Sequence, residues 1–197
     1  MPPGREGSSL AGHDLPRPPG DTCVTDVDRI ETARMVLERL RASHHDELSV
    51  LLRDPRVART LWPGEGPASE AQLLHILGDK LEHWDRHGFG LWLLRDRASG
   101  AVVGRGGLQH TNVGGNAEIE AGWAIVPERW GEGLATELAQ ACTAVAFEQL
   151  ELEQIVAFTL PTNVASRRVM EKSGFAYERD VSHKDLVHVL YRAGSRR

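Results

Sequence analysis

A strand that runs into a glycine loop and then into an amphipathic helix is the feature that most limits how this chain can fold. Alternating residues up to Val126 predict the strand, and Pro127 ends it because proline cannot donate to a strand ladder. The loop carries Gly131 and Gly133, and apolar residues recur at helical spacing from Leu134. Unpaired N–H groups at such a helix start can hold a phosphate, and glycines let it approach closely.

The glycine loop matches neither of two common nucleotide-binding motifs. No Gly-Lys-Ser/Thr follows it, which excludes a P-loop. A Gly-x-Gly-x-x-Gly dinucleotide motif would need a glycine where the chain has Thr136, and the loop follows a hairpin instead of opening a βαβ unit. On the glycines alone, a turn before a helix start with no ligand is equally consistent with the sequence.

The pattern on both sides of the loop predicts one mixed α/β domain. Ser43 is expected to cap a helix that Pro55 ends, and Ser69 with Gln72 forms a capping box for the next helix. Strands are expected near residues 35–40, 89–95, 102–108, 117–126, 154–160, 175–181 and 185–191, and helices near 43–54, 69–87, 134–148 and 161–173. About seven strands and four helices predict an α/β (α+β) fold with a mostly antiparallel sheet and helices on both faces.

Residues 1–28 of the 197 are rich in Pro, Gly and Asp and show no period, so we expect a flexible tail, with residues 29–197 as a single domain. A formal net charge of −5 argues against a nucleic-acid partner. No apolar run is long enough for a membrane span, and the first residues lack a secretory signal. Two cysteines form no disulfide framework, and nine histidines show no metal-ligand spacing, so we expect surface histidines, no metal and a cytoplasmic protein.

The negative charge is concentrated around the glycine loop. Between Asn116 and Glu153 the sequence has eight glutamates and only one arginine. Glu118 and Glu120 share one face of their strand. We therefore expect this segment to favour a cationic amine as substrate.

Residues 130–137, Trp-Gly-Glu-Gly-Leu-Ala-Thr-Glu, resemble the acetyl-coenzyme A pyrophosphate loop of the GNAT superfamily of N-acetyltransferases. Gly133 and Ala135 match the last two fixed positions of its pattern, Gln/Arg-x-x-Gly-x-Gly/Ala. Trp130 stands where Gln or Arg is usual, a departure typical of the branch with the ribosomal-protein N-terminal (alanine/serine) acetyltransferases. Segments 31–37, 120–125 and 163–175 also resemble that branch, so the likeness spans about residues 30–192.

The resemblance implies a splayed pair of central strands and a set of coenzyme-binding residues. In this superfamily the pantetheine arm enters the gap and pairs with backbone groups, here near Ile125 and Val126. Asn163 would contact the same arm and Arg168 a coenzyme phosphate. The residues implied to bind acetyl-CoA are Ile125, Val126, Trp130, Gly131, Glu132, Gly133, Leu134, Ala135, Thr136, Asn163, Ser166 and Arg168.

Acetyl transfer to an amine needs a group that takes a proton, and Glu120 occupies the matching position. We expect Glu120 to be the general base or the anchor of the ammonium, with Glu118 as the second choice. The alternative is a solvated polar face of the sheet. By resemblance the Ser166 hydroxyl reaches the thioester sulfur, and it becomes the candidate proton donor because Met170 stands where a tyrosine is usual. The local sequence is equally consistent with Asn163 as a helix cap alone.

These observations predict an acetyl-CoA-dependent N-acetyltransferase, monomeric or homodimeric, that acts on a protein N-terminus or a small amine by direct attack. Neither cysteine lies in a matched catalytic segment, which disfavours an acyl-enzyme. Three alternatives stay open. They are an aminoglycoside or other small-amine acetyltransferase, a non-catalytic acyl-CoA-binding module, and an unrelated nucleotide binder.

Overall fold

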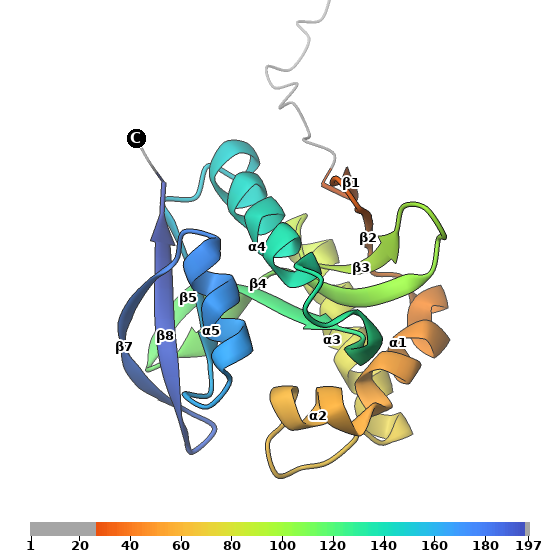
Figure 1. The fold of residues 1–197 in the computed structure, drawn as a ribbon, viewed down its shortest axis with the longest axis horizontal. Coiled ribbons are helices and arrows are strands. Elements are labelled where there is room, and N and C mark those ends of the chain that lie inside the picture. Colours follow the sequence, from red (N-terminus) through yellow and green to blue (C-terminus); the bar gives the residue numbers. More distant parts are fainter. Residues whose placement is uncertain (1–26, 196–197) are drawn as a thin grey trace, which may run out of the picture.

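The computed structural model of the chain describes residues 27–195, so the tail expected over residues 1–28 lies almost entirely outside the described part. The described residues form one eight-stranded sheet in the order β1-β2-β3-β4-β5-β6-β8-β7 (Figure 1). The strands are β1 (Arg29–Glu31), β2 (Met35–Arg39), β3 (Leu91–Asp96), β4 (Val102–Val113), β5 (Asn116–Ile125), β6 (Gln154–Thr159), β7 (Ala176–His183) and β8 (Leu186–Gly194).

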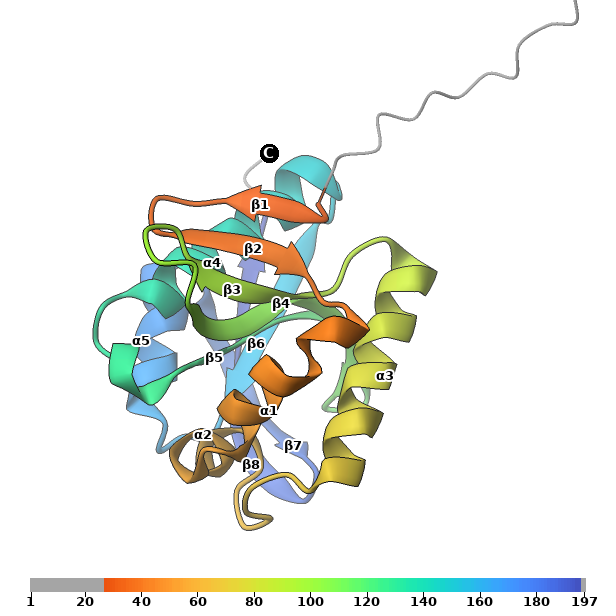
Figure 2. The same ribbon diagram turned by 90° about the vertical axis from the view of Figure 1, so that its right-hand side faces the viewer.

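Five α-helices of the described chain cover the two faces of this sheet. They are α1 (His45–Arg53), α2 (Pro55–Leu61), α3 (Glu70–His87), α4 (Leu134–Ala144) and α5 (Val164–Lys172). Helices α1 and α3 lie on one face, and α4 and α5 lie on the other (Figure 2). None of the helices in residues 27–195 has the length and apolar character needed to cross a membrane.

Apolar side chains at helical spacing fix each helix against the sheet. Leu138 and Cys142 of α4 are fully buried in the largest core cluster. Leu48, Leu52 and Leu73 of α1 and α3 are buried in a second cluster. Each such side chain contributes about 1.5–3 kcal/mol when buried, so the apolar stripes place the helices.

The expected fold class is confirmed, and three local expectations are wrong. A short first strand, β1, brings the strand count to eight instead of seven. Pro55 begins α2 instead of only ending α1, because Asp54 caps the backbone N–H of Arg56 and proline suits the first helical position. Ser43 lies inside a 3₁₀ turn (Ala42–His44), so it does not cap α1.

The pairing of the sheet is interrupted at its centre, between β5 and β6. These strands are parallel, and their only paired residues are Glu120 and Val156. By contrast β5 pairs with β4 along its whole length, from Ile125 opposite Gly104 to Asn116 opposite Val113. The two central strands therefore diverge past Glu120, which opens the sheet toward the start of α4.

Candidate active site

A cleft of about 1000 Å³ opens where β5 and β6 diverge, with the start of α4, α5 and the β7–β8 hairpin around it. It brings together residues that lie far apart in the sequence. The predicted site residues that line it are Glu120, Ile125, Trp130, Gly131, Gly133, Leu134, Ala135, Thr136, Asn163, Ser166 and Arg168. Glu118, Val126 and Glu132 are not part of its lining.

The glycine loop presents the first turn of α4 to this cleft. Gly131 and Gly133 have φ of +85° and +84°, which side chains rarely tolerate. Gly133 is the N-cap residue of α4, and no side chain caps this helix. A Cβ at Gly131 would meet nothing within 4 Å, so the loop faces open space. Uncapped N–H groups beside open space fit an anionic pyrophosphate.

The glycine loop is held in place by Arg34, which lies just before β2. Its backbone N–H and its Nε donate to the Glu137 carboxylate at 2.8 and 2.7 Å, and Thr32 Oγ1 donates to the same carboxylate at 2.6 Å. Arg34 Nη1 also donates to the carbonyl of Glu132 at 2.7 Å. Burial opposes the charge on Glu137, but these hydrogen bonds hold its pKa below the usual range.

Backbone groups at the end of β5 are already paired, which corrects one expectation. The Val126 N–H donates to the Val103 carbonyl at 2.9 Å, and the Val126 carbonyl accepts from Arg129 N–H at 3.0 Å. The Trp130 indole N–H donates to the Ile125 carbonyl at 2.8 Å. Val126 therefore offers no free N–H to a pantetheine arm, because the turn after β5 uses it.

Glu120 is half-buried in the cleft wall, and its carboxylate accepts a 2.8 Å hydrogen bond from the Gln109 side-chain amide. Burial raises the pKa of Glu120, while Gln109 and the nearby charges of Lys80 and Arg105 act to lower it. A carboxylate with a raised pKa in a cleft is suited to accept a proton near neutral pH.

Lys80 and Arg105 are two cleft residues that the sequence reasoning missed. Burial lowers the pKa of Lys80, and it lowers the pKa of Arg105 to about 10. The Arg105 Nε is buried without a hydrogen-bond partner among the described residues. The helical spacing of α3 could have indicated that Lys80 faces inward, because Lys80 shares the helix face that buries Leu77 and Trp84.

Glu118 is placed elsewhere, against β8. Its two carboxylate oxygens accept from Arg192 at 2.8 and 3.0 Å, and Arg192 also pairs with Glu178. Three more glutamates of the acidic segment are paired as well, in Glu128–Arg56, Glu132–Arg129 and Glu137–Arg34. The expectation of a cationic substrate assumed free carboxylates at the site, and ion pairing within the fold removes that basis.

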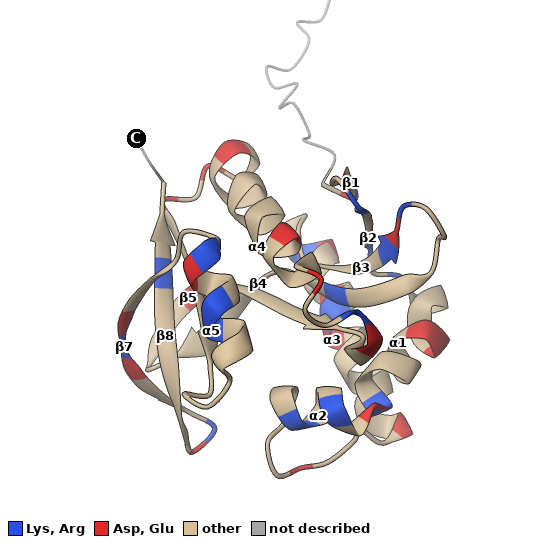
Figure 3. Ribbon diagram, viewed as in Figure 1, with Lys and Arg blue, Asp and Glu red and all other residues tan. Residues whose placement is uncertain are grey.

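Helix α5 supplies the opposite side of the cleft. The Asn163 side chain accepts from the Ser166 N–H at 3.1 Å, so Asn163 is the helix cap, and it also lines the cleft. Basic residues mark this helix (Figure 3), and Arg168 and Lys172 line the cleft. Arg167 instead donates to Tyr191 Oη at 3.2 Å, so it is committed to the fold.

Buried histidines correct the expectation that all are surface residues, and His44 is one of them, with 8% of its surface exposed. His188 of β8 is buried, with 9% of its surface exposed, and lines the cleft together with half-buried His183. The described residues also include a group of three histidines that could hold a metal ion. His188 begins a run of four consecutive buried residues of β8, followed by the apolar Val189 and Leu190, and this apolar run was the available signal.

Comparison with known proteins identifies the family of this chain. Residues 34–176 match the acetyltransferase (GNAT) domain family. The chain belongs to this family and has its GNAT fold. The FsC-acetyl coenzyme A-N(2)-transacetylase of Aspergillus fumigatus is 29% identical over 160 residues, 75% of this chain and 65% of that protein. The chain spans about half to two-thirds of the length of the first curated relatives it matches.

Solved structures are similar over most of their length. A GnaT-family acetyltransferase of Bordetella pertussis has a TM-score of 0.74 and 26% identity, covering 84% of this chain and 99% of that one. The ribosomal alpha-N-protein acetyltransferase RimL, in complex with coenzyme A, has a TM-score of 0.68 and 16% identity. The match covers 84% of this chain and 97% of the RimL chain. Ribosomal-protein acetyltransferases are thus among the structural neighbours, as the sequence resemblance predicted.

Proposed function

We propose that this protein transfers an acetyl group from acetyl-CoA to a primary amine by direct attack, with Glu120 as the group that accepts the amine proton. The observation that carries this proposal is the Glu120 carboxylate, whose pKa is raised by burial, in the cleft that the glycine loop borders. Only the neutral amine is a nucleophile, so a base beside it lowers the barrier. Acetyl-CoA, when bound, supplies the thioester.

The residues of the cleft fit this coenzyme. The uncapped start of α4, with Gly131 and Gly133 before it, would hold the pyrophosphate through backbone N–H groups. Arg168 would meet a phosphate, and Asn163 would contact the pantetheine arm from α5. No basic side chain is needed at the loop itself, which explains how an acidic segment can border an anionic coenzyme.

Ser166 is the proposed proton donor to the departing thiolate. It lines the cleft, and its backbone N–H, not its hydroxyl, makes the hydrogen bond to Asn163. Met170 is buried and cannot donate a proton. An acyl-enzyme is disfavoured, because burial raises the pKa of the fully buried Cys142 to about 12 and leaves it an unreactive thiol.

The charged side chains around Glu120 affect which acceptor amine the cleft favours. The cations Lys80 and Arg105 lie near Glu120 in the cleft wall, which also includes Glu65 and Asp79. Among the described residues, the buried Arg105 Nε has no hydrogen-bond partner. This arrangement favours an acceptor that carries an anionic group near its amine over a polycationic one. A peptide N-terminus followed by an acidic residue and a small amino acid both carry such an anionic group near the amine.

The test is acetyl-CoA-dependent thiol release with a panel of amines. The panel contains peptides with acidic or basic second residues, amino acids, and aminoglycosides. We expect turnover with at least one anionic acceptor, and acetyl-CoA should raise the melting temperature by mass action. Tight binding of acetyl-CoA without turnover on any amine would favour a non-catalytic module. No rise in melting temperature would favour an unrelated ligand.

A further inference from the structure

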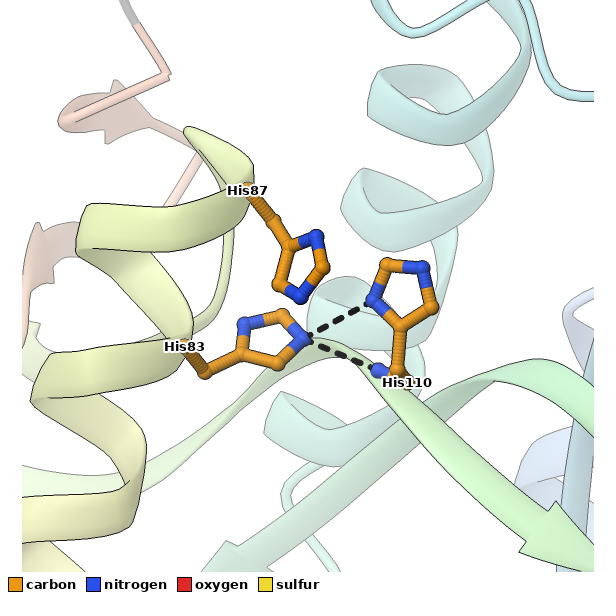
Figure 4. Close-up of side chains that lie close together, drawn as sticks. All are labelled: His83, His87 and His110. Atoms are coloured by element: carbon orange, nitrogen blue, oxygen red, sulfur yellow. Dashed lines mark hydrogen bonds between the residues drawn. The ribbon is translucent and has the colours of Figure 1, made fainter.

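Three histidines meet where the end of α3 lies against β4, at the edge of the cleft (Figure 4). His83 and His87 are one turn apart on α3, and His110 belongs to β4. One ring nitrogen of each lies within 4.8 Å of those of the other two. His83 is half-buried, while His87 and His110 are exposed to solvent, so an ion can reach the group.

The His83 ring is oriented by a backbone carbonyl. Its Nδ1 lies 2.9 Å from the carbonyl oxygen of Phe89. Since a carbonyl only accepts, Nδ1 carries the hydrogen and Nε2 carries the lone pair. Histidines that bind metals are commonly fixed in this way, with the second ring nitrogen donating to a carbonyl.

The Nε2 lone pair of His83 points toward His110. Nε2 lies 3.1 Å from His110 Nδ1 and 3.0 Å from the backbone N–H of His110. Two nitrogens bound to one tetrahedral Zn²⁺ at about 2.0–2.1 Å would be about 3.3 Å apart, close to the first of these distances. An ion bound there would replace the hydrogen bond from the backbone N–H.

We propose that His83, His87 and His110 bind one transition-metal ion of the Zn²⁺ type. Three neutral imidazoles suit Zn²⁺, Ni²⁺ or Cu²⁺, whereas Mg²⁺ and Ca²⁺ prefer oxygen ligands. The three side chains leave a fourth position for water or an outside ligand. The ion would join α3 to β4 at His110, which lines the cleft and follows Gln109, the partner of Glu120, and so would brace the wall of the cleft.

The test is titration of the chelator-treated full chain with Zn²⁺ by calorimetry and with Co²⁺ by visible absorption. We expect one ion per chain, Co²⁺ bands typical of nitrogen ligands in a four- or five-coordinate site, and a melting temperature that rises with Zn²⁺. His87→Ala and His110→Ala should each weaken binding about tenfold or more. His75→Ala is the matched control, because His75 is exposed on the same helix and lies outside the cluster.

Two results would overturn the metal site. One is the absence of saturable binding at one ion per chain. The other is equal affinity in the chain and in His87→Ala, which would show that the three rings only stack. The rings are indeed in contact, with His87 and His110 centroids 4.1 Å apart. Circular dichroism of the metal-free variants checks the fold, and exposed His87 is the substitution least able to disturb it.

Discussion

Gln109 on β4 and Glu120 on β5 are cross-strand neighbours, and the Gln109 amide donates to the Glu120 carboxylate at 2.8 Å. The bond favours the charged form of Glu120, and burial favours the neutral form. The amide nitrogen of Gln109 faces Glu120, and the single side-chain oxygen of Gln109 is buried without a partner among the described residues. The Gln109 hydrogen bond therefore offsets part of the rise in the Glu120 pKa that burial causes.

Replacing Gln109 with leucine should move the acid limb of the rate profile to higher pH. The carboxylate is the active form of the base, and loss of the Gln109 hydrogen bond raises its pKa further, so a higher pH is needed to ionise it. The measurement is kcat/KM for acetyl transfer across the acid range. Gln140→Leu, an exposed glutamine on α4, is the control. An unmoved limb in Gln109→Leu would contradict the role of Glu120 as the titrating base.

The two glutamates of β5 should respond differently to the same change. Glu120→Gln should lower kcat/KM by about 10²–10⁴, the usual contribution of a general base. Glu118→Gln should leave turnover nearly intact and lower the free energy of unfolding by about 1–3 kcal/mol, because it weakens a largely buried ion pair with Arg192. Steady-state kinetics and chemical denaturation of both variants separate these effects. Equal turnover in both would refute the assignment.

Much of the fold could be predicted because local signals and packing agree. The Ser69–Gln72 capping box and the left-handed Gly88 bound α3 as expected, since both are set by neighbouring residues. Helix α2 is not evident from the sequence, because Pro55 is consistent with the end of α1 as well as with the first position of a new helix that Asp54 caps. Strand β1 is only three residues long, and it depends on pairing with β2.

The site was less predictable, because residues far away in the sequence determine which of its charged side chains form ion pairs. Glu118 and Glu120 look equivalent in the sequence, yet Arg192, which is 74 residues away, pairs with only one of them. Local pattern cannot report such pairing. Lys80 and Arg105 were missed for a related reason. The sequence shows a charged residue within an apolar pattern, but only the folded structure shows that Glu120 lies near both side chains in a cleft.

Glu137 should matter for coenzyme binding although it is expected to touch no coenzyme atom. Its carboxylate joins Thr32 and Arg34 to the start of α4. Glu137→Gln should raise the KM for acetyl-CoA more than it lowers kcat, and should lower the free energy of unfolding by about 1–3 kcal/mol. Glu148→Gln, an exposed glutamate further along the chain, is the control. An unchanged KM would show that the glycine loop holds its shape without this anchor.

Arg105 should determine which acceptors bind well. Arg105→Met keeps much of the apolar stem and removes the buried charge. The KM should therefore rise for an acceptor with an anionic group and stay unchanged for an amine without one. A tenfold rise corresponds to about 1.4 kcal/mol. Arg59→Met, at an exposed position of α2, is the control. If both classes of acceptor lost affinity equally, the effect of Arg105 would be structural.

Ser166 should affect the chemical step and not the stability of α5. Its hydroxyl is separate from the cap, which uses the Ser166 N–H and the Asn163 side chain. Ser166→Ala should therefore lower kcat by about 10² or more while the melting temperature is kept. Asn163→Ala should instead lower the free energy of unfolding by about 1 kcal/mol through loss of the cap. Ser182→Ala, at an exposed position of β7, controls for loss of a hydroxyl. Full turnover in Ser166→Ala would leave water as the proton donor to the thiolate.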